Sequence, residues 1–523
     1  MKLLSCLSTD GGGLPRPGDP RGAALGFEAW DEALAAARGD PEADAARDWS
    51  TLPSGRRLLA AIFGNSPFLS GHAVKEWRFL TRLVQAGPDP LFDEIIGATE
   101  RLVDPGEDTA ALMRRLRVVK RQAALLAAVA ELAGAWSLEE QMGALSRFAE
   151  AAIEAALRHL LRQAAAKAMI ALPDAAEPER DCGLIVLGLG KLGGRELNYS
   201  SDIDLILFYD AAKARVTARD GVQPFFSRLA RDLVRLLEER TGDGYVFRTD
   251  LRLRPDPAST PPAISVAAAM AYYESVGQNW ERAALIKARP VAGDRPAGRR
   301  LLGELRPFLW RRNLDFAAIQ DIHSIKRQIN AYRGGGRIAV EGHDIKIGRG
   351  GIREIEFFAQ TQQLIWGGRM PLLRVRATCE ALRRLAAAGH IDPATAATLI
   401  EDYRFLRRVE HRLQMVDDRQ THRLPSDRDG IARFATFLGY REPDAFAADL
   451  TAHLGSVEGY YADLFEQAPS LAGPGNLVFT GAEDDPETLR TLSGLGFADP
   501  PSVGALVRSW HHGRQRATRS QRA

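Results

Sequence analysis

The sequence predicts an α+β protein that is mostly helical and carries one small mixed sheet. Two regions, 26–170 and 301–467, are rich in Ala, Leu, Arg and Glu and repeat their apolar residues at helical spacing. Between these regions, apolar runs of strand length flank a cluster of glycines, and a helical pattern leads from them to a further strand pattern. We therefore expect a small sheet domain flanked by helical domains.

The length of 523 residues allows two to four domains. Polar or Gly- and Pro-rich stretches at 1–22, 173–180 and 469–474 mark the boundaries. The expected order is a loose N-terminus (1–25), a helical scaffold (26–170), the sheet domain (171–310), a helical bundle (311–468), and a linker with the start of a further helical unit (469–523).

The composition predicts a cytoplasmic protein that binds neither nucleic acid nor a membrane. Basic and acidic residues nearly cancel, 69 against 67, and no basic stretch is interleaved with aromatic residues. The three cysteines, Cys6, Cys182 and Cys379, form no CxxC pair, which is typical of a reducing compartment and argues against structural zinc. The apolar run at 123–130 is well short of a membrane span.

The chain is organised around residues 182–210, CGLIVLGLGKLGGRELNYSSDIDLILFYD. A strand predicted at 184–187 leads into the glycines, whose spacing at 188–193 matches the GxGxxG dinucleotide fingerprint. Only residues 195–201 separate these glycines from the next strand, whereas a parallel crossover needs a dozen residues or more. We therefore do not expect a dinucleotide site, and Lys191 lacks the following Ser or Thr of a P-loop.

Three carboxylates lie where a metal site can form. Asp202 and Asp204 open a strand and project from the same face, because strand side chains alternate. A strand pattern at 245–255 carries Asp250, and the helical pattern at 225–237 predicts a strand–helix–strand unit in which the three converge. Carboxylate oxygens are preferred ligands of Mg²⁺, and two such ions can activate an attacking oxygen and stabilise a leaving one. Asp250 shares its strand face with Arg248, Arg252 and Arg254.

Four motifs resemble one bacterial family, the glutamine synthetase adenylyltransferase/adenylyl-removing enzymes. They are GLGKLGGRELNYSSDIDLILFYD, RTDLRLRP, YYESVGQNWERAALIKARPVAGD (272–294) and IKIGRGGIREIEFFAQTQQLIWGG (345–368). The resemblance runs from about residue 25 to the end, and it implies a nucleotidyltransferase fold of the DNA polymerase beta type. The family enzyme carries two such domains, and GQNWERAALIKAR and GRGGIREIEF are similar to the N-terminal copy. That copy implies removal of AMP: phosphate attacks adenylyl-tyrosine on glutamine synthetase and releases ADP.

The resemblance also implies residue roles. Asp202 and Asp204 would bind two Mg²⁺ (or Mn²⁺) ions, and Asp250 would complete one of the two sites. Backbone N–H groups, a hydroxyl and cationic side chains would position the phosphates and offset their charge. The residues expected to contact nucleotide or phosphate are Gly193, Gly194, Ser201, Lys191, Arg252, Arg254, Lys287, Lys346 and Arg349.

Two of these assignments have alternatives. Lys287 could reach a phosphate or adenylyl oxygen, or it could be a surface lysine whose stem packs on Trp280. The glycines at 348–351, with Lys346 and Arg349, could cradle a phosphate ahead of a helix, or they could form a tight helix–helix corner.

Other charged residues are expected to be structural. Glu354 and Glu356 are assigned to first-turn charge and ion pairing rather than to metal. The arginine-rich helix at 403–416 is expected to pack through its apolar residues and to leave its charges in solvent.

The implied partners are glutamine synthetase as protein substrate, the PII signal protein, inorganic phosphate, and ADP or ATP. Two alternatives remain: AMP transfer from ATP to glutamine synthetase, and a non-catalytic module that binds glutamine synthetase or PII. No second GGxELNxxSDIDL repeat occurs, so the chain is expected to be an N-terminal half without the AMP-attaching copy.

Overall fold

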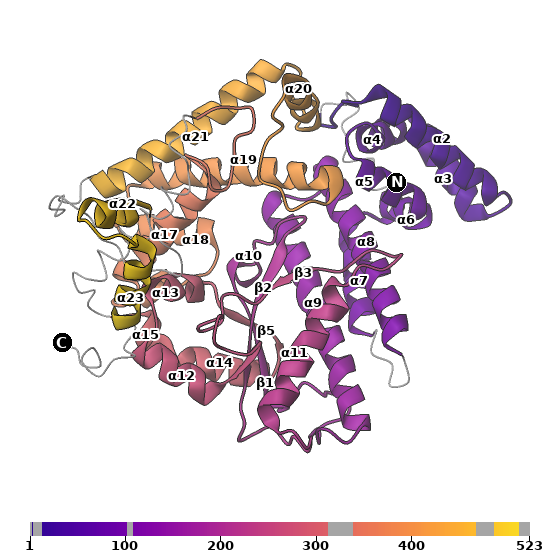
Figure 1. Cartoon of the computed structure of the whole chain (residues 1–523). Coiled ribbons are helices and arrows are strands. Elements are labelled where there is room, and N and C mark those ends of the chain that lie inside the picture. The colour runs from indigo at the N-terminus through magenta and orange to yellow at the C-terminus, as the bar shows by residue number, and fades with distance from the viewer. Residues whose placement is uncertain (1–2, 4–12, 102–107, 312–337, 467–485, 512–523) are drawn as a thin grey trace.

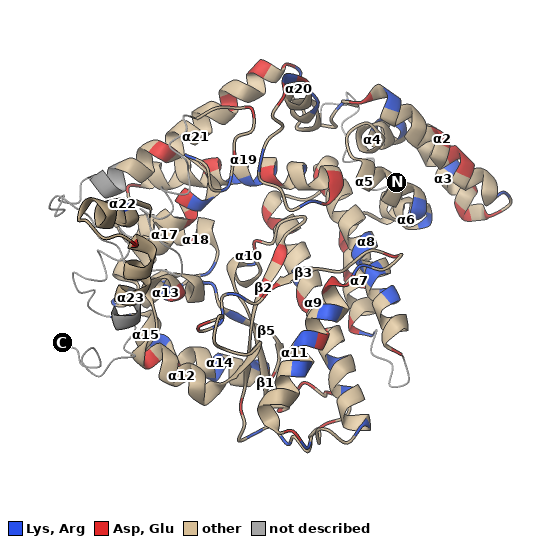
Figure 2. Ribbon diagram, viewed as in Figure 1, with Lys and Arg blue, Asp and Glu red and all other residues tan. Residues whose placement is uncertain are grey.

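The computed structural model describes residues 3, 13–101, 108–311, 338–466 and 486–511. Within them the protein is mostly helical with a small mixed sheet, which confirms the predicted fold class (Figure 1). No helix in these ranges is long and apolar enough to cross a membrane. Figure 2 shows basic and acidic positions interspersed along the helices. The linker expected at 469–474 lies outside the described residues.

Prolines set the starts of the N-terminal helices. Pro is tolerated in the first helical turn because its missing N–H has no intrahelical acceptor there. The first of these helices, α2, begins at Pro20 inside the segment expected to be loose, because the Asp19 side chain accepts a hydrogen bond from the Arg21 amide. The helices are α2 Pro20–Ala36, α3 Pro41–Thr51, α4 Pro53–Phe63, α5 Pro67–Lys75, α6 Trp77–Ala86, α7 Pro88–Glu100, α8 Thr109–Leu132 and α9 Leu138–Ala166.

The sheet has five strands in the order β3-β2-β1-β5, with β4 also paired to β2. Strands β1 and β2 are antiparallel, so the glycine turn between them is no parallel crossover, as its length predicts. Strands β2 and β3 are parallel and joined through α11, which is the predicted strand–helix–strand unit. The elements are β1 Leu184–Gly188, α10 Gly190–Gly194, β2 Asp202–Tyr209, α11 Val222–Glu238, β3 Arg248–Asp250, β4 Ala263–Ser265 and β5 Arg289–Gly293.

Both faces of the sheet are buried. Ile203, Leu205 and Leu207 enter one core with α8, α9 and α11, as the alternation of β2 predicts. Ile206 and Phe208 enter a second core on the opposite face, so β2 carries polar side chains only where it begins. The helices over this second face are α12 Val266–Ser275, α13 Asn279–Ile286, α14 Arg295–Glu304 and α15 Arg306–Leu309.

The C-terminal helices have a hydrophobic core of their own. Helix α19 lies between this core and the N-terminal helices, since it packs on α18 and α21 and also on α5 and α9 (Figure 1). The expectation that its charges lie in solvent is wrong for Arg407 and Glu410, which are fully buried, whereas Arg408 is exposed. The elements are α17 Ile352–Trp366, η1 Pro371–Leu373, α18 Thr378–Ala387, α19 Pro393–Asp417, α20 Arg428–Phe437, α21 Pro443–Glu466, α22 Pro486–Gly494 and α23 Pro500–His511.

Candidate active site

The register of β2 and β3 places the three carboxylates together. Asp202 and Asp204 are alternate residues of β2 and share a face. In the parallel pairing of β2 with β3, Asp204 is the partner of Asp250. The site therefore lies where both strands emerge from the core, and burial of Ile203 between the two aspartates fixes which face they use.

Burial and neighbouring charges shift the pKa values of Asp204 and Asp250 in opposite directions. Burial, followed by the charges of Asp202 and Asp250, raises the pKa of Asp204 to about 7. The positive charges of Lys346 and Arg353 act on the pKa of Asp204 in the opposite direction. Burial also raises the pKa of Asp250, but hydrogen bonds from Arg252 outweigh this effect and hold it below its usual value.

Arg252 forms hydrogen bonds and an ion pair with the carboxylate of Asp250. The Arg252 backbone N–H lies 2.7 Å from Oδ1, and its Nη2 and Nε lie 2.6 and 2.9 Å from Oδ2. The strand predicted at 245–255 is therefore too long, because the chain turns at Asp250 to make these bonds. The Arg252 side chain is otherwise 83% exposed. Arg254 instead donates to the carbonyls of Leu251, Pro257 and Thr260 and holds the loop that follows.

The described residues contain no group of three or more His, Cys, Asp or Glu side chains already arranged to hold a metal ion. The Asp250 oxygens face the guanidinium of Arg252. The donor set nevertheless suits a hard divalent cation, since all three groups are carboxylates. The raised pKa of Asp204 indicates negative charge that such a cation would offset.

The glycine turn packs directly on Asp204. Gly190 has a φ of +51°, and a Cβ atom built on it would lie 2.1 Å from Asp204 Oδ2. The Leu189 amide also donates to the Asp204 carbonyl at 2.9 Å. Gly190 was absent from the predicted contact residues, although its place in the glycine cluster was a usable signal.

The other residues of this turn have mainly packing roles. The Gly193 amide donates to the Leu189 carbonyl, and a Cβ at Gly193 would lie 2.2 Å from the Lys287 carbonyl oxygen. A Cβ at Gly194 would meet Glu196 Oε2 at 2.8 Å. Of the predicted small phosphate-positioning residues, Ser201 lies beside a carboxylate, with its Oγ 3.3 Å from Asp202 Oδ1.

The two predicted lysines, Lys191 and Lys287, belong to a buried ion cluster. Lys191 Nζ lies 2.6 Å from Glu356 Oε1. Lys287 is only 4% exposed, with its Nζ 2.7 Å from Glu196 Oε2 and 3.4 Å from Glu356 Oε1. The alternative of a surface lysine is therefore wrong for Lys287. Burial, and then the charge of Arg407, lowers the pKa of Lys191 to about 8.

The glycine segment before α17 forms a tight corner. The amides of Gly348, Gly351, Ile352 and Arg353 all donate to backbone carbonyls within residues 344–348. A phosphate cradle here would need those amides, so the structure favours the corner. Arg349 pairs with Glu458 of α21, while Lys346 Nζ lies 3.5 Å from His422 Nε2.

Sequence reasoning missed Arg353. It is exposed in the first turn of α17 and, with Lys346, supplies positive charge near Asp204. Its place in the first turn of a helix that starts at a glycine corner was the available signal.

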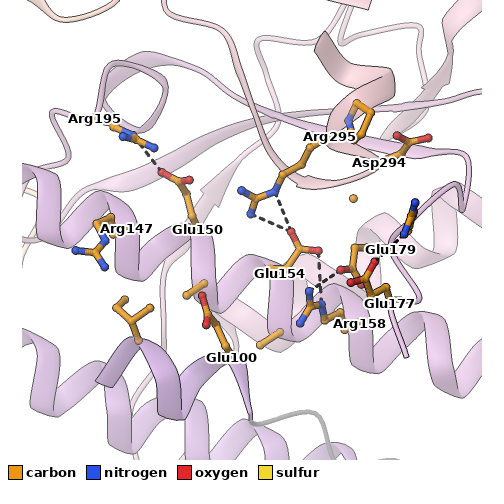
Figure 3. Close-up of a pocket in the computed structure, with 16 residues that line it drawn as sticks. Glu100, Arg147, Glu150, Glu154, Arg158, Glu177, Glu179, Arg195, Asp294 and Arg295 are labelled. Carbon is orange, nitrogen blue, oxygen red and sulfur yellow. Dashed lines mark hydrogen bonds and ion pairs between the residues drawn. The ribbon is translucent and has the colours of Figure 1, made fainter. Parts of the chain in front are cut away.

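A cavity of about 840 Å³ lies apart from the carboxylates, between α9 and the start of α14. Figure 3 shows its acidic and basic side chains pairing with one another. Glu154 Oε2 lies 3.0 Å from Arg295 Nη2, and Arg158 pairs with Glu179 at 2.5 Å. Asp202, Asp204 and Asp250 are not among its lining residues.

A small mixed sheet with this carboxylate arrangement, set among helices, defines a domain of the nucleotidyltransferase class. Residues 56–304 match the family model described as glutamate-ammonia ligase adenylyltransferase, and residues 323–465 match the model described as GlnD PII-uridylyltransferase. Residues 56–304 thus belong to the glutamate-ammonia ligase adenylyltransferase family, glutamate-ammonia ligase being another name for glutamine synthetase.

Its relatives include proteins named bifunctional glutamine synthetase adenylyltransferase/adenylyl-removing enzyme. The protein from Rhizobium meliloti is 54% identical over 473 residues, covering 89% of this chain and 48% of the relative. The Brucella melitensis protein is 53% identical over 470 residues, with the same two coverages. The Mesorhizobium japonicum protein is 51% identical over 496 residues, 94% of this chain and 50% of the relative. The chain thus spans about half the length of the curated relatives it matches.

Proposed function

We propose that this chain is a metal-dependent nucleotidyltransferase that removes AMP from the adenylylated tyrosine of glutamine synthetase by phosphorolysis. The observation that carries the proposal is the pairing of Asp204 with Asp250 across parallel strands, with Asp202 on the same face of β2. The relatives' name includes an adenylyl-removing activity, and this chain matches about half of their length.

In the proposed reaction, a phosphate oxygen attacks the phosphorus of the tyrosine-linked AMP. A new P–O bond forms and the bond to the tyrosine oxygen breaks; the tyrosine oxygen takes up the proton that the phosphate loses, and ADP is the product. Asp202 and Asp204 would hold two Mg²⁺ or Mn²⁺ ions and Asp250 would complete one site; such ions offset charge on the attacking and leaving oxygens.

The chain's own cations would act beside these carboxylates. Lys346 and Arg353 lie near enough to affect Asp204 and would attract the anionic nucleophile. Arg252 is exposed, so on releasing Asp250 its guanidinium would be free to offset charge on the transferring group. Ser201 would orient an oxygen next to Asp202.

One assay tests this function. The full chain would be mixed with adenylylated glutamine synthetase, Mg²⁺ and inorganic phosphate, and ADP release followed. We expect phosphate-dependent ADP that is lost in Asp202→Asn and retained in Asp220→Asn, a matched control whose carboxylate pairs with Arg228 on the surface. ADP release that persists in Asp202→Asn would contradict the site assignment.

A second candidate is the forward reaction, because the relatives' name also includes adenylyltransferase. It uses the same carboxylates, so unmodified glutamine synthetase would be incubated with ATP and the chain. Incorporation of AMP without any phosphorolysis would replace our proposal.

We also propose that the PII signal protein acts on this chain, as the match of residues 323–465 to a PII-uridylyltransferase model suggests. Calorimetric titration of PII into the full chain tests this. Binding without either reaction would favour a non-catalytic module. We place the activity in the cytoplasm, in keeping with Cys182 and Cys379, which are buried free thiols.

A further inference from the structure

The short helix α10 is in direct contact with Asp204. Gly190, its first residue, leaves no room for a Cβ next to Asp204 Oδ2, and Leu189 just before it donates to the Asp204 carbonyl. A displacement of α10 would therefore displace the carboxylate. With only five residues, α10 has few hydrogen bonds of its own to fix its place.

A residue far along the chain holds this helix. Lys191, the second residue of α10, has its ammonium 2.6 Å from Oε1 of Glu356, which is 165 positions further along the chain in α17. Both side chains are largely buried. A charge-assisted bond shielded from water is stronger and more directional than one at the surface.

The other acids of the buried ion cluster are engaged elsewhere, so they do not replace Glu356 as the partner of Lys191. Three buried cations, Lys191, Lys287 and Arg407, lie near three acids, of which Glu196 and Glu410 are buried and Glu356 is largely buried. The Glu196 carboxylate is already engaged by Lys287 and by the Thr378 amide. The Glu410 carboxylate lies within ion-pair distance of Arg407 and His422. Among these three acids, Glu356 is the one within ion-pair distance of Lys191.

We infer that Glu356 is a positioning residue for the metal-binding carboxylate Asp204, acting through Lys191 and α10. This inference rests on the proposed function, because it takes Asp204 as a metal ligand. In this role Glu356 acts through its ion pair with Lys191 rather than as a metal ligand. The region matched to the PII-uridylyltransferase model thereby shapes a site in the preceding domain.

The first test is Mn²⁺ binding to the full-length chain by isothermal titration calorimetry, without glutamine synthetase. We expect Glu356→Gln to weaken Mn²⁺ binding by about 10–100-fold, as for partners that orient a metal ligand. Glu380→Gln is the matched control, because Glu380 forms exposed ion pairs on α18 and should leave binding unchanged. Wild-type affinity in a folded Glu356→Gln protein would overturn the inference.

A double-mutant cycle separates positioning from simple charge balance. Lys191→Met removes the other half of the pair, does not leave an unpaired buried ammonium, and should weaken Mn²⁺ binding in the same way. Since both residues act through one bond, the double variant should bind no more weakly than the weaker single variant. It should also regain melting temperature, because the uncompensated cation is gone. If it regained Mn²⁺ affinity as well, Glu356 would merely neutralise Lys191 and the inference would fail.

Hydrogen exchange gives a readout that needs no metal. Amides of residues 190–194 should exchange faster in Glu356→Gln, while those of α8 should not change. Unchanged exchange at residues 190–194 would overturn the inference, whether or not the wild type binds Mn²⁺. Failure of the wild type to bind Mn²⁺ would count against the proposed metal site alone. Wild-type Mn²⁺ binding without ADP release would count against the proposed reaction but not against the role of Glu356.

Discussion

Asp204 illustrates how a single residue can be unfavourable for folding and useful for function. Burial and two neighbouring carboxylates raise its pKa to about 7, so its charged form is destabilised in the folded protein. Such strain is typical of sites whose charge is balanced by a ligand. Ile206 and Phe208 on the same strand face show the apolar alternative that the rest of β2 uses.

We predict that Asp204→Asn abolishes ADP release and raises the melting temperature. The amide removes a negative charge that is repelled by Asp202 and Asp250, so the folded state gains stability as it loses a metal ligand. Thermal unfolding and the phosphorolysis assay measure the two effects. Full activity, or loss of activity together with unfolding, would contradict the prediction.

Gly193 is constrained by space rather than by backbone conformation. We predict that Gly193→Ala costs about 1–3 kcal/mol of stability and lowers activity, because its Cβ would meet the Lys287 and Gly188 carbonyl oxygens at 2.2 and 2.7 Å. Gly143→Ala in α9 is the control: no atom lies within 4 Å of its Cβ, and alanine should add about 0.5–1 kcal/mol in a helix. Urea unfolding of both variants checks the contrast, and equal effects would be evidence against it.

At the scale of elements, α10 is anchored from two sides. Glu356 of α17 holds the Lys191 side chain. On the other side, Arg289 of β5 donates to the carbonyls of Leu192 and Gly193. The same guanidinium lies 2.7 Å from Glu150 of α9, a residue that lines the cavity of Figure 3. Helices from both flanking regions therefore fix the turn beside Asp204.

We predict that Arg289→Lys weakens Mn²⁺ binding several-fold. An ammonium is a single point donor and cannot reproduce the planar fork that joins Glu150 to two carbonyls. Arg195→Lys is the matched control, because Arg195 is exposed and lies 3.7 Å from the same Glu150. If both variants bound Mn²⁺ equally well in calorimetry, the second anchor would have no role in the site.

At the scale of the whole molecule, α19 joins the N-terminal helices to the C-terminal core. Its Arg407 donates to the Glu196 carbonyl and to Asn198, and the neighbouring Gln414 accepts from the Ser200 amide. On the side of the scaffold, His411 Nδ1 lies 2.9 Å from Gln141 Oε1 of α9. Helix α19 thus contacts both the segment between α10 and β2 and helix α9.

The burial of His411 in α19 predicts that the stability of the protein depends on pH. Burial, and then the charge of Arg407, lowers the pKa of His411 to about 4, despite the opposing charges of Glu131 and Glu410. The unfolded state then binds the proton more readily, so the His411 contribution is present above about pH 6.5 and is lost as pH falls toward 4. The difference in unfolding free energy between wild type and His411→Gln should therefore shrink by at most about 1.4 kcal/mol per pH unit. Urea unfolding from pH 7 to pH 4 measures it, and a constant difference would contradict the assigned pKa.

The sequence by itself determined the local frame of this protein. Period-two alternation placed Asp202 and Asp204 on one strand face, and the short glycine connection excluded a parallel crossover. Apolar spacing at 225–237 gave the helix that returns the chain to β3, and so brought Asp250 beside Asp204. These features depend on neighbours along the chain, which periodicity and chain length encode.

Only the tertiary structure decided which groups the cationic side chains contact. Lys191, Lys287 and Arg349 were expected to contact phosphate, yet each is paired with a carboxylate from another element. Arg407 and Glu410 of α19 were expected in solvent and are fully buried. The partner of a long charged side chain is set by residues that approach it in space, 165 positions apart for Lys191 and Glu356, and no local pattern encodes that approach.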